Sequence, residues 1–135
     1  MFSNRNTKPQ NRIDSLIGAG TRIEGNVSFT GGLRVDGEIK GNVIADSSKP
    51  STLVLSEQAR VDGEIKVTHL VVNGIIVGPV NASEYLELQS KAKVTGDVHY
   101  KVLEIQLGAI VEGKLIHLAE AADKVVAFKL GSSES

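Results

Sequence analysis

The chain has 135 residues, of which 41% are hydrophobic and 4% aromatic, and its formal net charge is −1. That is enough for one folded domain, while the balanced charge and the few aromatic side chains argue against a nucleic-acid partner. Cysteine is absent, which excludes disulfide bonds, thiolate metal ligands and palmitoylation. No apolar run approaches the roughly 20 residues of a membrane-spanning helix, and the first residues do not resemble a signal peptide.

Residues 1–16 are rich in Asn, Gln, Arg, Lys and Ser, which predicts a flexible N-terminal tail. Its one aromatic side chain would contribute about 2–3 kcal/mol on entering a membrane, and each basic residue near an anionic leaflet about 1 kcal/mol. One tail would bind weakly, and many tails on one assembly would bind by avidity. An ordinary flexible start without membrane contact is the alternative. The predicted membrane contact comprises Met1, Phe2, Arg5, Lys8 and Arg12.

After the tail, one hexapeptide recurs along the chain. Arg-Val-Asp-Gly-Glu-Ile stands at residues 34–39 and again, letter for letter, at residues 60–65. Apolar and polar residues alternate within each copy, which predicts a half-buried strand, and the central glycine predicts a bend. Because the copies are alike, we expect the chain to turn a corner at the same place in each. Looser copies occupy residues 22–27, 71–76, 93–98 and 110–115.

Apolar residues six positions apart connect these copies, and three six-residue sides make a coil of about 18 residues. This pattern predicts an all-β fold, a single-stranded β-helix (triangular β-solenoid) of about six coils over residues 17–118. Residues 46–52, with their Ser, Lys and Pro, form the one obvious loop insertion. The predicted coils begin near Ile17, Leu33, Leu53, Leu70, Leu86 and Leu103.

The last segment, residues 119–135, contains an apolar stretch at residues 125–130 and ends in Gly-Ser-Ser-Glu-Ser. The polar end predicts disorder. The apolar stretch has two open interpretations: it folds back and caps the last coil, or it joins an intermolecular contact.

The opening Gly20-x-x-Ile23-x-Gly25, the recurring phrase and the six-coil length resemble a bactofilin over about residues 17–118. Residues 1–3, Met-Phe-Ser, are also similar to the membrane-targeting start of many bactofilins. The resemblance implies a right-handed β-helix that polymerises without nucleotide into non-polar filaments through the ends of the rod. It also implies a cytoplasmic protein, peripheral at the inner face of the cytoplasmic membrane, that scaffolds cell-shape or cell-wall proteins. Residues 75–79 depart from the phrase, and the chain after Leu118 matches the family least.

End-to-end assembly also follows from the predicted fold. Only the terminal coils of a solenoid keep unpaired strand edges, and monomeric solenoids usually cover them with a cap. Two adhesive ends on one rod give a chain of rods, not a closed dimer. A non-polymerising adaptor that binds a partner protein on a flat face is the alternative. The predicted polymer interface comprises Ile17, Ile23, Val27 and Phe29 at one end, and Leu103, Ile105, Val111, Leu115, Phe128 and Leu130 at the other.

Hexapeptide solenoids also occur among acyltransferases and zinc enzymes, so the histidines need to be considered. His69, His99 and His117 follow the nearest upstream phrase glycine by six, three and four residues. Imidazoles so far out of register do not converge on a zinc ion within one rod. There is no Walker loop either, so no nucleotide is expected. We therefore predict a non-enzymatic protein with no catalytic residue, metal site or cofactor.

Several carboxylates precede the phrase glycines and are predicted to stack in a column. Paired carboxylates can hydrolyse sugars or bind calcium, but an arginine two residues before most of them faces the same way. A solvated, charge-neutralised ladder therefore explains them without chemistry. These carboxylates are Glu24, Asp36, Asp62 and Glu112.

Overall fold

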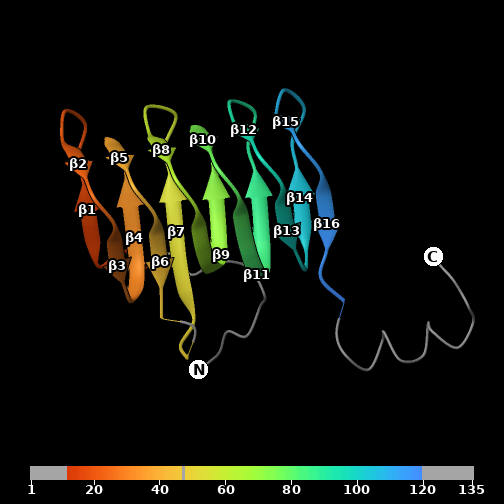
Figure 1. Cartoon of the computed structure of the whole chain (residues 1–135), viewed down its shortest axis with the longest axis horizontal. Coiled ribbons are helices and arrows are strands. Elements are labelled where there is room, and N and C mark those ends of the chain that lie inside the picture. Colours follow the sequence, from red (N-terminus) through yellow and green to blue (C-terminus); the bar gives the residue numbers. More distant parts are fainter. Residues whose placement is uncertain (1–11, 47, 120–135) are drawn as a thin grey trace, which may run out of the picture.

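The computed structural model describes residues 12–46 and 48–119, and their regular structure consists of sixteen short β-strands. Figure 1 shows the strands following one another along a rod, in chain order from one end to the other. Within these residues there is no helix capable of spanning a membrane.

The strands wind into six coils, with three strand segments in each coil. The first two coils consist of β1 (Ser15–Ile17), β2 (Arg22–Glu24), β3 (Val27–Phe29), β4 (Gly31–Val35), β5 (Glu38–Lys40) and β6 (Val43–Ala45). The third and fourth consist of β7 (Ser51–Leu55), β8 (Arg60–Asp62), β9 (Ile65–Val72), β10 (Ile75–Val77) and the first half of β11 (Val80–Leu88). The second half of β11, β12 (Lys93–Thr95), β13 (Val98–Tyr100), β14 (Leu103–Ile105), β15 (Ile110–Glu112) and β16 (Leu115–His117) complete the last two.

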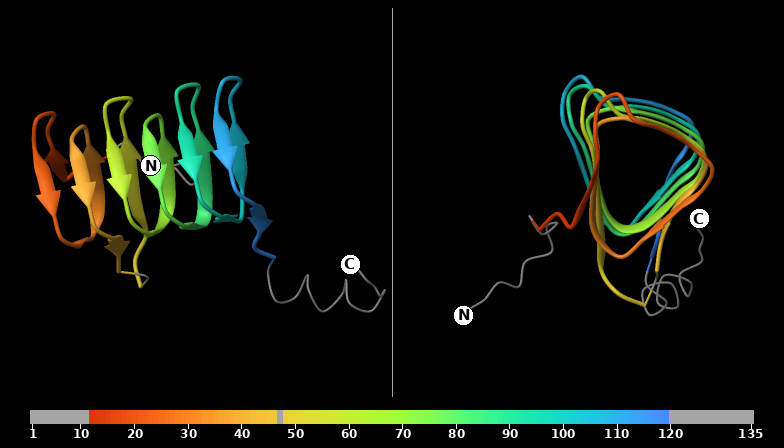
Figure 2. Two further views of the ribbon diagram at one scale, coloured as in Figure 1. Left: turned by 45° about the horizontal axis from the view of Figure 1, so that its top comes forward. Right: turned by 90° about the vertical axis from the view of Figure 1, so that its left-hand side faces the viewer.

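Parallel strand pairing joins each coil to the next and produces three flat faces. Face 1 contains β1, β4, β7, the second halves of β9 and β11, and β14. Face 2 contains β2, β5, β8, β10, β12 and β15, and face 3 contains β3, β6, the first halves of β9 and β11, β13 and β16. The right-hand view of Figure 2 shows the resulting triangle. The predicted β-solenoid of about six coils is therefore confirmed.

The predicted coil starts form one column on face 1, with one exception. Leu33 pairs with Leu53, Leu53 with Leu70, and the column continues through Leu86 to Leu103. In the first coil, however, Ser15 pairs with Leu33, and Ile17 pairs with Val35. The predicted start at Ile17 is thus two residues late, because a polar serine occupies the column position in the outermost coil.

The identical hexapeptides lie at different corners, which corrects the expectation that each copy bends at the same place. Residues 34–39 bend at the corner between faces 1 and 2, whereas residues 60–65 bend between faces 2 and 3, and Glu38 pairs with Arg60. We call these corners A and B, and corner C joins face 3 to face 1. A strand–glycine–strand phrase is compatible with either bend, so only the surrounding coils decide which one it forms. Six glycines stack at corner B: Gly25, Gly41, Gly63, Gly78, Gly96 and Gly113.

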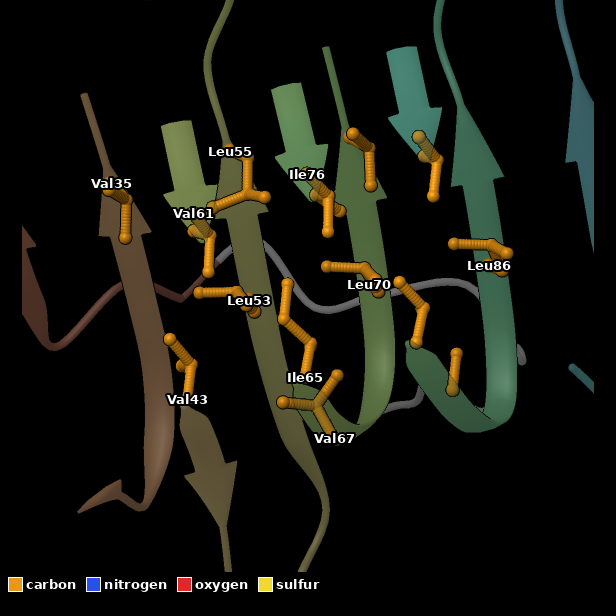
Figure 3. Close-up of a cluster of buried hydrophobic side chains, with 14 of the residues drawn as sticks. Val35, Val43, Leu53, Leu55, Val61, Ile65, Val67, Leu70, Ile76 and Leu86 are labelled. Carbon is orange, nitrogen blue, oxygen red and sulfur yellow. The ribbon is translucent and has the colours of Figure 1, made fainter. Parts of the chain in front are cut away.

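Inward-pointing aliphatic side chains from the three faces fill the rod (Figure 3). Leu53, Val61 and Ile65, one from each face of the third coil, are 0% exposed. Each fully buried side chain of this kind stabilises the fold by roughly 1.5–3 kcal/mol. The core therefore runs along the rod axis, and its two ends are the places where it meets the surface.

A loop interrupts the second turn at corner C, between β6 and β7. At its start, the Asp46 Oδ1 accepts hydrogen bonds from the Ser48 N–H at 3.0 Å and from the Ser48 hydroxyl at 2.9 Å. In the right-hand view of Figure 2 the loop projects beyond the triangular outline. The predicted insertion is thus confirmed, and it overhangs the outer surface of the rod.

Candidate assembly interfaces

Among the described residues, the first and last coils each have strand neighbours on one side only. β1, β2 and β3 pair with β4, β5 and β6, and β14, β15 and β16 pair with β11, β12 and β13. The opposite edges of these six strands present backbone N–H and C=O groups that no described strand pairs. Such edges are ready to pair with another chain.

At the N-terminal end, the four predicted interface residues form one apolar layer. Ile17, Ile23, Val27 and Phe29 are half-buried and pack against the central core. Val61, which occupies the position of Ile23 two coils further along the rod, is fully buried by coils on both sides. The difference arises because no described coil covers the outer side of the first one. Their role in assembly stays a prediction.

At the C-terminal end, the predicted residues are still more exposed. Leu103 and Val111 are half-buried against the core, while Ile105 and Leu115 are exposed to 51% and 44%. These four come from the three faces of the last coil and are therefore brought together. The other two predicted interface residues, Phe128 and Leu130, lie outside the described residues.

The rim of the last coil carries apolar side chains that the sequence pattern did not reveal. Leu107 is 96% exposed at corner A, and Ile110 is 48% exposed on the outer side of face 2. Both escape a six-residue period because neither points into the core. Comparison with the preceding coil would have found both, because polar residues stand at these positions there. Leu107 occupies the position of Ser90, and Ile110 occupies the position of Lys93. At the other end Leu16, 60% exposed, is a similar case.

Of the predicted membrane-contact residues, only Arg12 lies within the described part, and it is exposed. Its Nε is 3.0 Å from Asp14 Oδ1, while Asp14 Oδ2 accepts the Gly32 N–H at 2.9 Å. The Gly32 N–H, and to a smaller extent Arg12, hold the pKa of Asp14 below its usual value. Arg12 therefore offers a lipid surface a charge that Asp14 already partly neutralises. Met1, Phe2, Arg5 and Lys8 lie outside the described residues.

Ion pairs on the surface explain the recurring Arg-x-Asp pattern. Arg22–Glu24, Arg34–Asp36 and Arg60–Asp62 are paired within their own strands at 3.3, 2.9 and 3.0 Å. Exposed pairs of this kind contribute little to stability. The predicted column of four carboxylates is wrong for one member: Asp36 lies at corner A, away from the column that Glu24, Asp62 and Glu112 share. Lys40 separates Glu24 from Asp62 in that column.

The three histidines lie in different columns. His69 is at corner C, with its Nδ1 2.9 Å from Thr68 Oγ1. His99 lies on face 3 between Asn81 and Ile116, and the His117 Nε2 lies 3.0 Å from the Lys101 carbonyl oxygen. Within residues 12–46 and 48–119, no three His, Asp or Glu side chains gather closely enough to hold a metal ion.

Within residues 12–46 and 48–119, the chain is a β-solenoid with a continuous apolar core and, at each end, a coil whose outer side no described strand covers. A family model described as "Bactofilin: Polymer-forming cytoskeletal" matches residues 15–116. The chain therefore belongs to the bactofilins, a family of structural, polymer-forming cytoskeletal proteins.

Two curated relatives come from Myxococcus xanthus (strain DK1622). Bactofilin BacP is 26% identical over 102 residues, which cover 76% of this chain and 41% of BacP. Bactofilin BacO is 26% identical over 114 residues, which cover 84% of this chain and 85% of BacO. The chain thus spans less than half the length of BacP and most of BacO. No solved structure matches the chain significantly.

Proposed function

We propose that this chain assembles end to end into cytoskeletal filaments, through the two uncovered coils of its β-helix and without a nucleotide. The observation that carries this proposal is the coincidence, at both ends of the described rod, of strand edges that no described strand pairs with an apolar layer. Burying one such side chain contributes roughly 1.5–3 kcal/mol, whereas association costs on the order of 4–15 kcal/mol. Several side chains must therefore be covered together, and each end offers four from its three faces.

We further propose that like ends meet, which gives a non-polar filament. If one rod continued the stack of the next, β15 would pair with β2, and Glu112 would lie beside Glu24. A contact between like ends does not bring Glu112 beside Glu24, because it joins each end to a copy of itself.

Single charges placed at each end test both the assembly and its polarity. We propose Ile23→Glu for the N-terminal end and Val111→Glu for the C-terminal end, measured by analytical ultracentrifugation. In a non-polar filament each single variant keeps one intact contact and stops at a dimer, while the double variant is a monomer. In a head-to-tail filament either single variant alone gives monomers, because each contact needs both ends.

Val77→Glu is the matched control, because it adds the same charge to the outer side of face 2 in the middle of the rod. It should assemble like the wild type. All variants should keep the circular dichroism of a β-sheet protein. Filaments that persist in the double variant would contradict the proposed interface, whatever the polarity of the filament.

We also propose that the filament lies against the inner face of the cytoplasmic membrane and localises cell-shape or envelope proteins there. The support is the apolar and basic tail, Met1, Phe2, Arg5 and Lys8 followed by Arg12. Many weak tails on one filament bind by avidity. Wild-type protein should therefore sediment with anionic vesicles, and both Phe2→Ser and the monomeric double variant should lose most of that binding. Equal binding by the monomeric variant would contradict the coupling between assembly and membrane contact.

A further inference from the structure

One inward-pointing column of side chains on face 3 ends differently at the two ends of the rod. Val67 pairs with Ala82, Ala82 with Tyr100, and Tyr100 with His117 in the last coil. Val67 and Ala82 are buried in the core, so the column points inward. Phe29 occupies the same position in the first coil, since β3 pairs with β6 and β6 with β9. The N-terminal layer therefore contains a phenyl ring where the C-terminal layer contains an imidazole.

Contacts with the preceding coil determine which nitrogen of neutral His117 carries the proton. The Nε2 lies 3.0 Å from the Lys101 carbonyl oxygen, which can only accept a hydrogen bond, so Nε2 is the donor. The ring lies beside that of Tyr100, with the two centroids 5.6 Å apart. A second proton would therefore be gained at Nδ1, for which the described residues provide no acceptor.

The charged groups around His117 do not compensate a positive charge on its ring. From β13 it is faced by Tyr100 and by Lys101, whose Nζ lies 3.7 Å from Glu84 Oε1. The other ionisable groups of β13 and the last coil point outward: His99, Glu104, Glu112 and Lys114. No carboxylate in the described part of the chain forms an ion pair with His117. An imidazolium here would depend on water for its stabilisation.

A contact at the C-terminal end would remove that water. His117 is exposed in the single chain, where water can hydrate either protonation state. Within a contact, burial favours the neutral imidazole, because burying a charge costs more than burying a neutral polar group. The contact is therefore strongest above the ordinary histidine pKa of about 6.5 and weakens as the pH falls below it. A contact between like ends is symmetric and contains two His117 side chains, so each chain contributes this effect once.

We propose that His117 makes the C-terminal contact between two chains open in mild acid, while the N-terminal contact stays closed. This inference rests on the proposed assembly through like ends. The histidines of the chain begin at His69, so neither of the first two coils contains one, and the N-terminal contact has no comparable group. A filament formed at neutral pH would thus separate in acid into dimers that are joined through their N-terminal ends.

The test measures the dimers of the two single-end variants by sedimentation equilibrium, at about pH 7.5 and about pH 5.5. Ile23→Glu retains only the C-terminal contact. Its dimer should dissociate about a hundredfold more readily at the lower pH, since one pH unit below the histidine pKa costs about tenfold for each of two side chains. Val111→Glu retains only the N-terminal contact, and its dissociation constant should change by less than about twofold.

Two further substitutions in the Ile23→Glu protein assign the effect to one side chain. In His117→Gln the amide can still donate to the Lys101 carbonyl oxygen but cannot gain a charge, so the dimer should hardly respond to pH. His99→Gln is the matched control, because it removes an outward-pointing histidine from the neighbouring strand and should leave the pH response intact. Circular dichroism should show the same β-sheet signal for every variant at both pH values.

The outcomes separate this inference from the assembly on which it rests. An Ile23→Glu dimer that is equally strong at both pH values, or a pH response that survives His117→Gln, would contradict the inference and leave end-to-end assembly standing. An Ile23→Glu protein that is monomeric already at neutral pH would contradict assembly through like ends, and this inference with it.

Discussion

The backbone of Gly63 passes directly over the carbonyl oxygen of Gly41: a Cβ atom on Gly63 would lie 2.1 Å from that oxygen. The same relationship recurs up the corner, since a Cβ on Gly113 would lie 2.1 Å from the Gly96 oxygen. Corner B is therefore a stack of backbone against backbone, with no room for a side chain. This contact between neighbouring coils requires the phrase glycines Gly63, Gly96 and Gly113.

We predict that Gly63→Ala destabilises the fold by about 3 kcal/mol or more, because the backbone itself must move to admit the methyl group. Gly18→Ala is the matched control, since its Cβ would have nothing within 4 Å. Thermal unfolding of both variants, followed by circular dichroism, checks this. Equal midpoints for the two variants would show that corner B is looser than the contact distance indicates.

The coils could be predicted from the sequence because two signals agree. Apolar and polar residues alternate within each strand, and the apolar coil starts recur at a regular interval. Leu53, Leu70 and Leu86 are large apolar residues at nearly constant spacing, and a rod with one core needs that spacing. The corner at which each hexapeptide bends was not predictable from its letters. Residues 34–39 and 60–65 are identical, and only pairing with the coils above and below separates them.

The candidate interfaces show the same limit. Alternation predicted correctly that Ile23 and Val111 point inward, because strand residues two apart share a face. Leu107 was missed because a corner residue belongs to neither the alternation nor the period. The corner glycines of residues 39–43 and 76–80 were missed for a related reason. Their phrases, Ile-Lys-Gly-Asn-Val and Ile-Val-Gly-Pro-Val, share with the hexapeptide only the glycine and the apolar residues two positions before and after it.

Leu53 and Leu107 provide a test of which apolar residues hold the fold and which are available for contacts. Leu53→Ala should cost about 2–5 kcal/mol of unfolding free energy, because Leu53 is 0% exposed in the core. Leu107→Ala should leave the unfolding free energy of the rod nearly unchanged, since the side chain is 96% exposed. Denaturant unfolding in the background of the monomeric double variant measures both. A large loss for Leu107→Ala would contradict its exposed position.

Tyr85 should make the fold sensitive to alkali. Burial, then its hydrogen bond to Glu104 and the nearby Glu87 charge, raise the pKa of the Tyr85 phenol well above its usual value. The neutral phenol therefore stabilises the fold below its unfolded pKa of about 10, and this contribution is lost as the pH rises further. Tyr85→Phe should cost about 1 kcal/mol at pH 7 and show a shallower loss of stability above pH 10 than the wild type. Parallel alkaline curves for the two proteins would contradict this.

Asp14 should make the first coil sensitive to acid, whereas Tyr85 makes the fold sensitive to alkali. Its carboxylate accepts the Gly32 N–H and pairs with Arg12, and these contacts lower the pKa of Asp14 in the folded chain. The stabilisation is present above the unfolded pKa and is lost as the pH falls below it. Asp14→Asn should therefore increase amide exchange in β1 and β4 at pH 7 and make that exchange less dependent on pH below 4. Unchanged protection of Gly32 in the variant would show that this contact does not hold the first coil.

The central claim, end-to-end assembly through the uncovered coils, is tested most directly by negative-stain electron microscopy of the purified chain in buffer without nucleotide or metal. The account predicts long filaments of single-rod width for the wild type and for Val77→Glu, and none for the Ile23→Glu, Val111→Glu double variant. Small discrete particles in all three samples would contradict it and would favour an adaptor that binds its partner on the side of the rod.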